Sequence, residues 1–416
     1  MCDIPKVDHL LLLVGGNPLP NAVAGVLLGN KEGQLSLIHS SETAPIAQRL
    51  QSWFRDQGFA LPRLYQADEA EADKITREVQ RALQLGRTSS VGLNYTGGTK
   101  TMAVHAYRAA ELWAGANNTP RPTFSYLDAR TLRMVFDAPA PENGEASSAA
   151  YAGQAAKITV KDLVALHGWT LLHEPVTVAI LPQTAGVLAM LNANNDSHQA
   201  WLQWIRAELL PKCRRPDDKD WKSKTELKQQ HLAWPDEISP LLQEITAVLQ
   251  QELGLNGKTL SVHEAAVACG YREPKHFCGW LHGKWLEHYT LDILNNAAET
   301  LHLHQSAQNI EPREVQFDVD VVAMRGYQLF AISCSTDDTK PLLKSKLFEA
   351  YIRARQIGGD EARVALICGI EKPEVLEREM RRDVDPDGRI RVFGREQFPT
   401  LAEELAWWIK DQSQEP

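Results

Sequence analysis

The feature that most constrains the fold is an alternation of short apolar segments with helical patterns at the start of the chain. The apolar segments are residues 8–14, 33–39 and 90–94. The helical patterns occupy residues 43–57, 70–85 and 101–114. Strands and helices that alternate at this spacing predict a doubly wound, mostly parallel sheet. Residues 123–137 then predict a closing pair of strands.

Composition changes abruptly after residue 137, which predicts a domain boundary. Residues 138–158 are rich in Pro, Gly, Ala and Ser, a composition typical of a linker. Residues 159–254 show mainly helical patterns, and residues 255–416 carry a helix, a β-hairpin, a helix and a strand in that order. A chain of 416 residues also exceeds what one hydrophobic core usually serves. We therefore predict an α/β protein with a Rossmann-like domain over 1–137, a helical connecting region and a second α/β domain.

The charge balance limits the partners that we expect. The net charge of -9 disfavours a protein that coats nucleic acid over its whole surface, so a nucleic-acid contact would need a local groove. Lys and Arg gather between Lys212 and Lys228, but aspartates interrupt them, so a solvated loop is the alternative to a nucleic-acid contact. The six cysteines form no CxxC pair, and no signal peptide or membrane span is visible. We expect a cytoplasmic protein.

The segment Asn94–Lys100, NYTGGTK, combines the features of an anion-binding loop. It follows an apolar strand and precedes a helical pattern. The adjacent Gly97 and Gly98 let the backbone turn tightly and approach a ligand. Free N–H groups at the start of the helix favour an anion, and Lys100 adds a positive charge. Further hydroxyl donors come from Thr96, Thr99 and Thr101.

A plain β-α turn that uses its glycines for geometry is the structural alternative for this loop. A Walker A motif is excluded, because that motif separates its glycines by four residues and here they are adjacent. A second strand end, with Gly15, Gly16 and Asn17, is expected at the same carboxyl edge of the sheet. Open α/β sheets bind their ligands at that edge.

A strand, the pattern N-x-T-G-G-T-K and a helix in the first hundred residues resemble the CARF sensor domains of type III CRISPR systems. The resemblance implies that a cyclic oligoadenylate binds across a two-fold interface in a homodimer. Cyclic tetraadenylate fits two equivalent sites best. The predicted ligand-binding residues are Gly16, Asn17, Ser40, Thr96, Gly97, Gly98, Thr99, Lys100 and Thr101.

Two carboxylates stand out in the last third of the chain. Asp318 and Asp320 alternate with apolar residues, so both project from the same face of a predicted strand over 315–324. Such a pair commonly holds a divalent cation, with Mg²⁺ or Mn²⁺ the expected ions. Glu287, on a predicted helix over 280–295, is a candidate third ligand or else a surface acid. Asp318 has its own alternative, a charge that keeps a sheet edge soluble.

The layout from 280 to 368 resembles the PD-(D/E)xK restriction-endonuclease-like domain that follows CARF in the CRISPR ancillary nucleases. In that family the second strand of the hairpin, here predicted over 328–334, carries a glutamate and a lysine, where this chain has Ser333 and Ser335. Serine supplies neither a carboxylate for the cation nor an ammonium for the transition state.

Lys346 and Glu349 offer a replacement for the missing groups. They lie three residues apart on a predicted helix over 344–356 and so share a face, and migrated lysines occur in this superfamily. The alternative is a surface ion pair on the helix of a catalytically degenerate domain. The predicted catalytic residues are Asp320, Lys346, Glu349 and Glu287. The predicted metal ligands are Asp320, Asp318 and Glu349.

The two resemblances together imply a CRISPR defence effector in which a cyclic oligoadenylate switches on a metal-dependent nuclease. No base-reading element is visible, so DNA and RNA both stay open as substrates. Two other functions stay open as well. The chain is either a sensor that signals through a partner without cutting, or a CARF protein that cleaves its own ligand.

Overall fold

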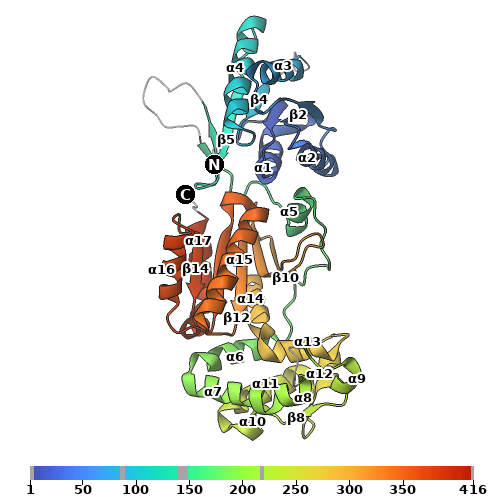
Figure 1. The fold of residues 1–416 in the computed structure, drawn as a ribbon, viewed down its shortest axis with the longest axis vertical. Helices are drawn as coiled ribbons and strands as arrows, with labels where there is room; N and C mark the ends of the chain where they lie inside the picture. The colour runs from blue at the N-terminus through green and yellow to red at the C-terminus, as the bar shows by residue number, and fades with distance from the viewer. Residues whose placement is uncertain (1–3, 85–89, 138–148, 216–219, 414–416) are drawn as a thin grey trace.

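The computed structural model describes residues 4–84, 90–137, 149–215 and 220–413. It contains two mixed β-sheets and a set of helices that lies between them in the sequence (Figure 1). In space the second sheet occupies the middle of the molecule, with the first sheet above it and the helices below. We call these parts the N-terminal unit, the C-terminal unit and the helical unit.

The N-terminal sheet has the strand order β3-β2-β1-β4-β5-β6-β7. Its first five strands in that order run parallel, and β6 and β7 complete it in antiparallel fashion. The strands are β1 (Val7–Leu13), β2 (Gly29–His39), β3 (Arg63–Gln66), β4 (Val91–Asn94), β5 (Thr123–Asp128), β6 (Arg133–Phe136) and β7 (Ala149–Tyr151). The prediction of a mostly parallel sheet with a closing strand pair is confirmed. The last strand lies in the range predicted as a linker, and the rest of that range up to residue 148 lies outside the described residues.

Helices cover both faces of this sheet. They are α1 (Leu19–Leu28), α2 (Ala44–Asp56), α3 (Ala72–Leu83) and α4 (Lys100–Asn117). Along β1, Leu10 and Leu12 join the core cluster that contains α1 and α2, whereas Leu11 and Leu13 join the cluster that contains α3 and α4. Because neighbouring strand residues point to opposite faces, β1 is buried on both sides, which explains the apolar run from Leu10 to Leu13. The sheet is therefore doubly wound.

The C-terminal sheet has the order β10-β11-β12-β13-β14. Its strands are β10 (Gln305–Ile310), β11 (Val319–Arg325), β12 (Gln328–Ser335), β13 (Arg363–Cys368) and β14 (Ile390–Phe393). Strands β10 to β12 pair antiparallel, and β12 to β14 pair parallel. Its helices are α14 (Trp285–Asn296), α15 (Lys340–Gly358), α16 (Pro373–Asp383) and α17 (Leu401–Gln412). The predicted order of helix, hairpin, helix and strand is confirmed.

One predicted helix is interrupted. The pattern over 280–295 predicts a single helix, but a π-helical turn over Trp280–Lys284 precedes α14, with extended backbone at Gly283 (φ 176°). Glycine loses more conformational entropy in a helix than any other residue, which favours the break at this position. Lys284 and Glu287 therefore belong to a separate helix from the residues before the break.

The helical unit packs against the C-terminal sheet. It comprises α6 (Pro182–Ala193), α7 (Asn195–Trp204) with a π-helical turn (Ile205–Leu209), α8 (Leu210–Cys213), α9 (Lys224–Leu227), α10 (Pro235–Ile238), α11 (Gln243–Leu253), α12 (Val262–Ala268), α13 (Pro274–Gly279) and a small hairpin of β8 (His231–Leu232) and β9 (Leu260–Ser261). Along β11, Val321 and Ala323 share a core with this unit, while Val322 and Met324 share one with the N-terminal unit. A short helix, α5 (Val160–Leu166), lies against α2 and α15. Within the described part of the chain, no helix is long and apolar enough to cross a bilayer.

Candidate functional site

The loops after β1 and β4 meet at one edge of the N-terminal sheet. These two strands are parallel neighbours, so their carboxyl ends lie together. A Cβ atom at Gly97 would lie 2.2 Å from the carbonyl oxygen of Leu13, and one at Gly15 would lie 3.0 Å from the backbone N of Gly98. Gly98 also adopts a positive φ of 76°. The glycines thus allow the two loops to touch, which is the geometric role expected of them in a plain β-α turn. Both loops lie at the edge of the sheet where a ligand would bind.

Two loop hydroxyls are used inside the protein. Thr96 Oγ1 donates to Asn94 Oδ1 (2.8 Å) and accepts from the backbone N–H of Leu127 (2.7 Å). Thr99 Oγ1 donates to the carbonyl oxygen of Glu69 (2.8 Å) and accepts from the backbone N–H of Met102, which caps α4. These bonds fix the loop. The donors that remain for an anion are the first N–H groups of α4, including those of the predicted Lys100 and Thr101, and the exposed Lys100 side chain.

The three other predicted ligand residues have different surroundings. Gly16 is exposed, with open space around a hypothetical Cβ atom. Asn17 accepts a hydrogen bond from the N–H of Leu19 (3.0 Å), and its Nδ2 atom lies only 2.3 Å from where a Cβ atom of Gly359 would stand. Asn17 therefore contacts the C-terminal unit. Ser40 is buried, and its backbone N–H donates to Thr43 Oγ1 (3.0 Å) in the turn that leads into α2.

Asp320 lies at the start of β11, opposite the end of β12. Its Oδ2 atom accepts hydrogen bonds from the backbone N–H of Cys334 (2.7 Å) and from Ser333 Oγ (2.9 Å). Burial raises the pKa of Asp320, against these hydrogen bonds, which lower it. The charge of Asp318, an exposed residue just before the strand, raises it further. Ser333 thus stands beside Asp320, at the position where the resemblance stated above leads us to expect a glutamate.

Glu287 is the buried acid at this place. Its side chain is on α14, and the residue is only 8% exposed. Burial and the negative charge of Asp320 raise the pKa of Glu287 to about 8, although Lys284 Nζ lies 3.9 Å from its Oε2 atom. The charge of Lys346 lowers the pKa of both acids. The structure therefore brings Glu287, Asp320 and Lys346 together, with Asp318 at the edge.

Glu349 is exposed on α15, one turn from Lys346. The next residue on this side of the helix, Arg353, has its guanidinium carbon 4.9 Å from the centre of the Phe317 ring. Glu349 thus lies on a helix side that faces the start of β11. Among the described residues, however, no three His, Cys, Asp or Glu side chains form a group that could hold a metal ion. The predicted ligands Asp318, Asp320 and Glu349 do not form such a group.

Glu287 and Asp320 still suit a cation. The charge of Asp320 raises the cost of ionising Glu287, and both are carboxylates, the oxygen ligands that Mg²⁺ and Mn²⁺ prefer. Both recorded hydrogen bonds to Asp320 go to Oδ2, which leaves Oδ1 for a cation. Glu287 was predicted from sequence as a catalytic residue and as a candidate third ligand.

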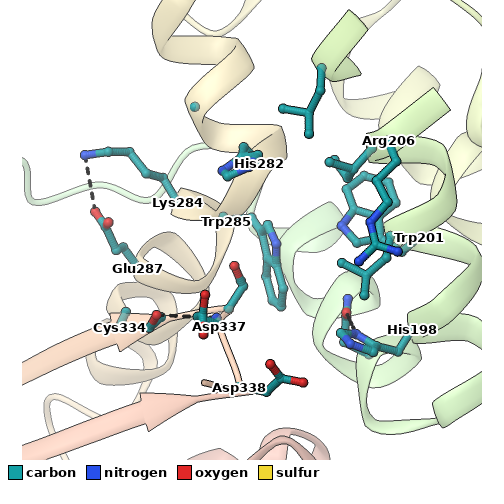
Figure 2. A pocket seen from close by; sticks show the side chains of 18 of the residues that line it. His198, Trp201, Arg206, His282, Lys284, Trp285, Glu287, Cys334, Asp337 and Asp338 are labelled. Carbon is teal, nitrogen blue, oxygen red and sulfur yellow. Dashed lines mark hydrogen bonds and ion pairs between the residues drawn. The ribbon is translucent and has the colours of Figure 1, made fainter. Parts of the chain in front are cut away.

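A cavity of about 700 Å³ opens beside these residues (Figure 2). Glu287, Lys284 and Cys334 lie on one side of it, and His198, Trp201 and Arg206 of the helical unit lie on the other. Asp337 and Asp338, which follow β12, and Lys346 also line it. The residues of the helical unit could not be assigned to this site from sequence, because they are distant in the chain and carry no motif. Asp337 and Asp338 had a signal, since they follow the carboxyl end of a predicted strand.

No protein-family model and no curated protein sequence matches the chain. Solved structures do. Can2 from Sulfobacillus thermosulfidooxidans, solved in complex with cyclic tetra-adenylate, superposes with a TM-score of 0.64 at 18% identity, covering 97% of each chain. Protein VC1899 from Vibrio cholerae gives a TM-score of 0.69 at 13% identity, covering 98% of this chain and 99% of the other.

A third structure is a type III CRISPR defence DNA nuclease activated by cyclic oligoadenylate, with a TM-score of 0.52 at 17% identity. The match covers 86% of this chain and 45% of that one. The chain therefore has the fold of Can2 and of VC1899 over nearly its whole length, and shares most of it with a type III CRISPR defence nuclease.

Proposed function

We propose that this chain is a metal-dependent nuclease that a cyclic oligoadenylate switches on, with cyclic tetraadenylate the expected activator, in type III CRISPR antiviral defence. Its reaction would be the hydrolysis of phosphodiesters in DNA, RNA or both. The observation that carries the proposal is the buried Glu287 beside the partly buried Asp320, with Lys346 lining the same cavity as Glu287. The likeness to Can2 and to a CRISPR defence nuclease supports it.

Asp320 and Glu287 would hold the cation, with Asp318 or Glu349 as further oxygen ligands. A bound Mg²⁺ or Mn²⁺ supplies charge stabilisation at a phosphate and lowers the pKa of a bound water. In the absence of a cation, Glu287 keeps its proton at neutral pH because of its raised pKa. Lys346 would stabilise the negative charge that develops on the phosphate. Ser335, at the position where a lysine was expected, cannot do so.

The activator would bind at the carboxyl edge of the N-terminal sheet. The N-terminus of α4 and Lys100 offer donors for a phosphate there. Along α4, Val104 and Leu112 are 63% and 58% exposed, and the exposed Arg108 lies between them on the same side of the helix. This side starts beside the loop, and we infer that a second copy of the chain covers it. The homodimer would then place two equivalent loops around one ring.

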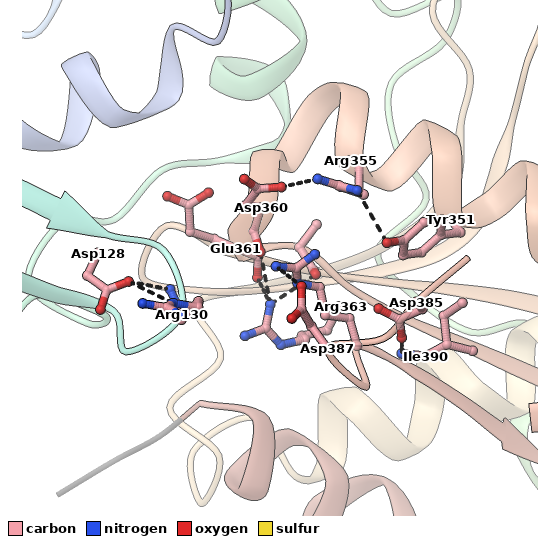
Figure 3. A network of polar contacts seen from close by, with 12 residues as sticks. Asp128, Arg130, Tyr351, Arg355, Asp360, Glu361, Arg363, Asp385, Asp387 and Ile390 are labelled. Carbon is pink, nitrogen blue, oxygen red and sulfur yellow. Dashed lines mark hydrogen bonds and ion pairs between the residues drawn. The ribbon is translucent and has the colours of Figure 1, made fainter. Parts of the chain in front are cut away.

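A path for activation runs from the β1–α1 loop into the C-terminal unit. Asn17 abuts Gly359, in the turn between α15 and β13. Arg363 holds this turn by donating from Nη1 to the carbonyl oxygens of Asp360 (3.2 Å) and Glu361 (2.9 Å) (Figure 3). Helix α15 runs from the turn towards Lys346. A ligand that moves Asn17 would thus move the helix that carries the catalytic lysine.

The proposal is tested by incubating the purified protein with cyclic tetraadenylate, Mg²⁺ or Mn²⁺, and plasmid, single-stranded DNA or RNA, following both the polymer and the activator. We expect loss of polymer only when the activator and the cation are both present. Asp320→Ala should abolish it, whereas the control Asp56→Ala, which removes an exposed acid of α2, should not. Cleavage that persists in Asp320→Ala would reject the proposed metal site.

Activation is tested with a pair of glycine variants. Gly359→Ala places a methyl group against Asn17 at a φ of 67°. Gly388→Ala also places one at a positive φ (72°), but its nearest neighbour lies 4.0 Å away. Only Gly359→Ala should raise the activator concentration for half-maximal cleavage, by about fivefold or more. Equal responses of the two variants would disprove the path through Asn17.

Ser333 favours a second function, a sensor that signals through a partner. The Ser333 hydroxyl donates a hydrogen bond to Asp320 Oδ2, and Ser333 has no carboxylate to offer a cation. Activator binding without polymer loss in the same assay would support this function. Loss of the activator itself would instead indicate that the N-terminal unit cleaves its ligand.

A further inference from the structure

The helical unit supplies the far wall of the cavity beside Glu287, and that wall is both aromatic and basic. The side chains from this unit and the adjoining π-helical turn include His198, Trp201, Arg206, Arg214, Trp221 and His282. Figure 2 shows His198, Trp201 and Arg206 across the cavity from Glu287 and Lys284. None of these residues belongs to the proposed metal site.

Trp221 is the aromatic side chain with a ring available for contact. Trp201 is 3% exposed and stacks on Trp204 (4.9 Å between ring centres), and Trp285 is 1% exposed, so both serve the core. Trp221 is only half-buried. The guanidinium carbon of Arg214 lies 5.4 Å from its ring centre, and the ring of His282 meets it edge-on at 5.8 Å. These contacts fix the plane of the ring.

Charge gathers in the cavity in a way that suits a phosphate chain. Arg206, Arg214, Lys284 and Lys346 line it, although the whole chain carries a net charge of -9. The acids in the lining, Glu287, Asp337 and Asp338, belong to the C-terminal unit. Arg206 and Arg214 come from the helical unit, whereas Lys284 and Lys346 stand on the side of the acids, of which Glu287 belongs to the proposed metal site. Local positive charge of this kind attracts nucleic acid at a single groove.

The dimensions limit what can enter. The cavity measures about 700 Å³ and meets a second one of about 880 Å³, and Trp221, Lys284 and Glu287 line both. Cavities of roughly 300–1,000 Å³ hold small ligands. A duplex, whose major groove alone is about 12 Å wide, does not fit into such a space. An unpaired nucleotide does, and aromatic rings beside basic side chains are the usual means of binding unpaired bases.

We propose that this cavity is a pocket for an unpaired nucleotide of the substrate, with the base stacked on Trp221 and an adjacent phosphate beside Arg206. This inference deepens the proposed nuclease function and rests on it, because the pocket shares Glu287 and Lys346 with the proposed metal site. The substrate class is single-stranded nucleic acid. The helical unit would then select the substrate, and the C-terminal unit would cut it.

The test measures binding of short fluorescent oligonucleotides by anisotropy, with the full chain carrying Asp320→Asn to prevent cleavage and with cyclic tetraadenylate present. We expect a single strand to bind more tightly than the blunt duplex of the same sequence. Adding Trp221→Ala should weaken single-strand binding about tenfold, within the range for loss of one stacked base. Trp221→Phe should retain most of the affinity, which separates stacking from misfolding.

A matched pair tests the phosphate contact. Arg206→Ala and Lys228→Ala each remove one positive charge from an exposed position of the helical unit, but only Arg206 lines the cavity. Arg206→Ala should weaken binding and Lys228→Ala should not. Unchanged binding in Trp221→Ala, or equal binding of duplex and single strand, would overturn the pocket. If the chain never cleaves but binds single strands through Trp221, the proposed nuclease is rejected and the pocket is kept. If Trp221→Ala leaves cleavage unaffected, the pocket is rejected and the nuclease is kept.

Discussion

Replacing Glu287 with glutamine removes a buried charge while keeping the shape of the side chain. The pKa of Glu287 is raised from 4.5 to about 8, first by burial and then by the charge of Asp320. Between these pH values the unfolded chain has lost the proton that the folded protein keeps. The free energy of unfolding therefore falls as pH rises from 4.5 to about 8 and is level above it.

The size of the effect follows from the same pKa values. One pKa unit corresponds to about 1.4 kcal/mol, so the full difference is about 5 kcal/mol. Relaxation of the site and entry of water reduce it, and we expect about 1 to 5 kcal/mol. Without divalent cations, Glu287→Gln should thus be more stable than the parent protein at pH 8, and the two should approach each other towards pH 4.5.

Urea unfolding in the presence of a chelator, at several pH values, measures this difference. The control Glu32→Gln changes an exposed glutamate of β2 and should follow the parent protein at every pH. Adding Mg²⁺ or Mn²⁺ at pH 8 should stabilise the parent protein more than Glu287→Gln, because the cation relieves the repulsion between the acids. If the parent and Glu287→Gln show the same pH dependence, the reasoning from burial and charge is wrong.

Four further substitutions test separate parts of the molecule. Lys100→Ala should weaken binding of cyclic tetraadenylate by about 1.5 to 3 kcal/mol in calorimetry, and an unchanged affinity removes Lys100 from the site. Lys346→Ala should lower the cleavage rate roughly 100-fold with activator binding intact, and full cleavage would exclude the migrated lysine. Gly25→Ala places a Cβ atom 2.3 Å from the Phe54 ring and should cost about 1–3 kcal/mol of stability. Gly115→Ala meets open space on α4 and should instead stabilise by about 0.5–1 kcal/mol, so equal thermal shifts would contradict this account.

Sequence patterns predicted the elements whose burial is regular. The central strand β1 carries an unbroken apolar run from Leu10 to Leu13 because both its faces are covered, and the hairpin of β11 and β12 is similarly recognisable. Strand β10 was not predicted because it buries polar residues, with Gln308 Nε2 hydrogen bonded to the His288 ring (3.1 Å). Helix α1 was not predicted because nearly all its residues are buried, which removes the amphipathic period from its sequence.

The candidate site was predictable only where neighbouring elements of one sheet build it. Asp320 and Lys346 belong to a strand and a helix of the same unit, so the resemblance to a known layout could place them together. Arg206 and Trp221 come from the helical unit, which occupies a different stretch of the sequence and packs against the end of the sheet. No local sequence pattern predicts that contact. The same holds for Asn17, whose neighbour Gly359 is brought to it by the packing of two units.

The contact between Asn17 and Gly359 has a thermodynamic consequence that runs in both directions. If an activator at the N-terminal edge favours one position of α15, then whatever binds best to that position must favour the activator by the same factor. Nucleic acid or a cation bound beside Lys346 would accordingly raise the affinity of the N-terminal unit for the cyclic nucleotide. A cell with abundant substrate would then need less activator, and the exhaustion of substrate would itself promote release of the signal.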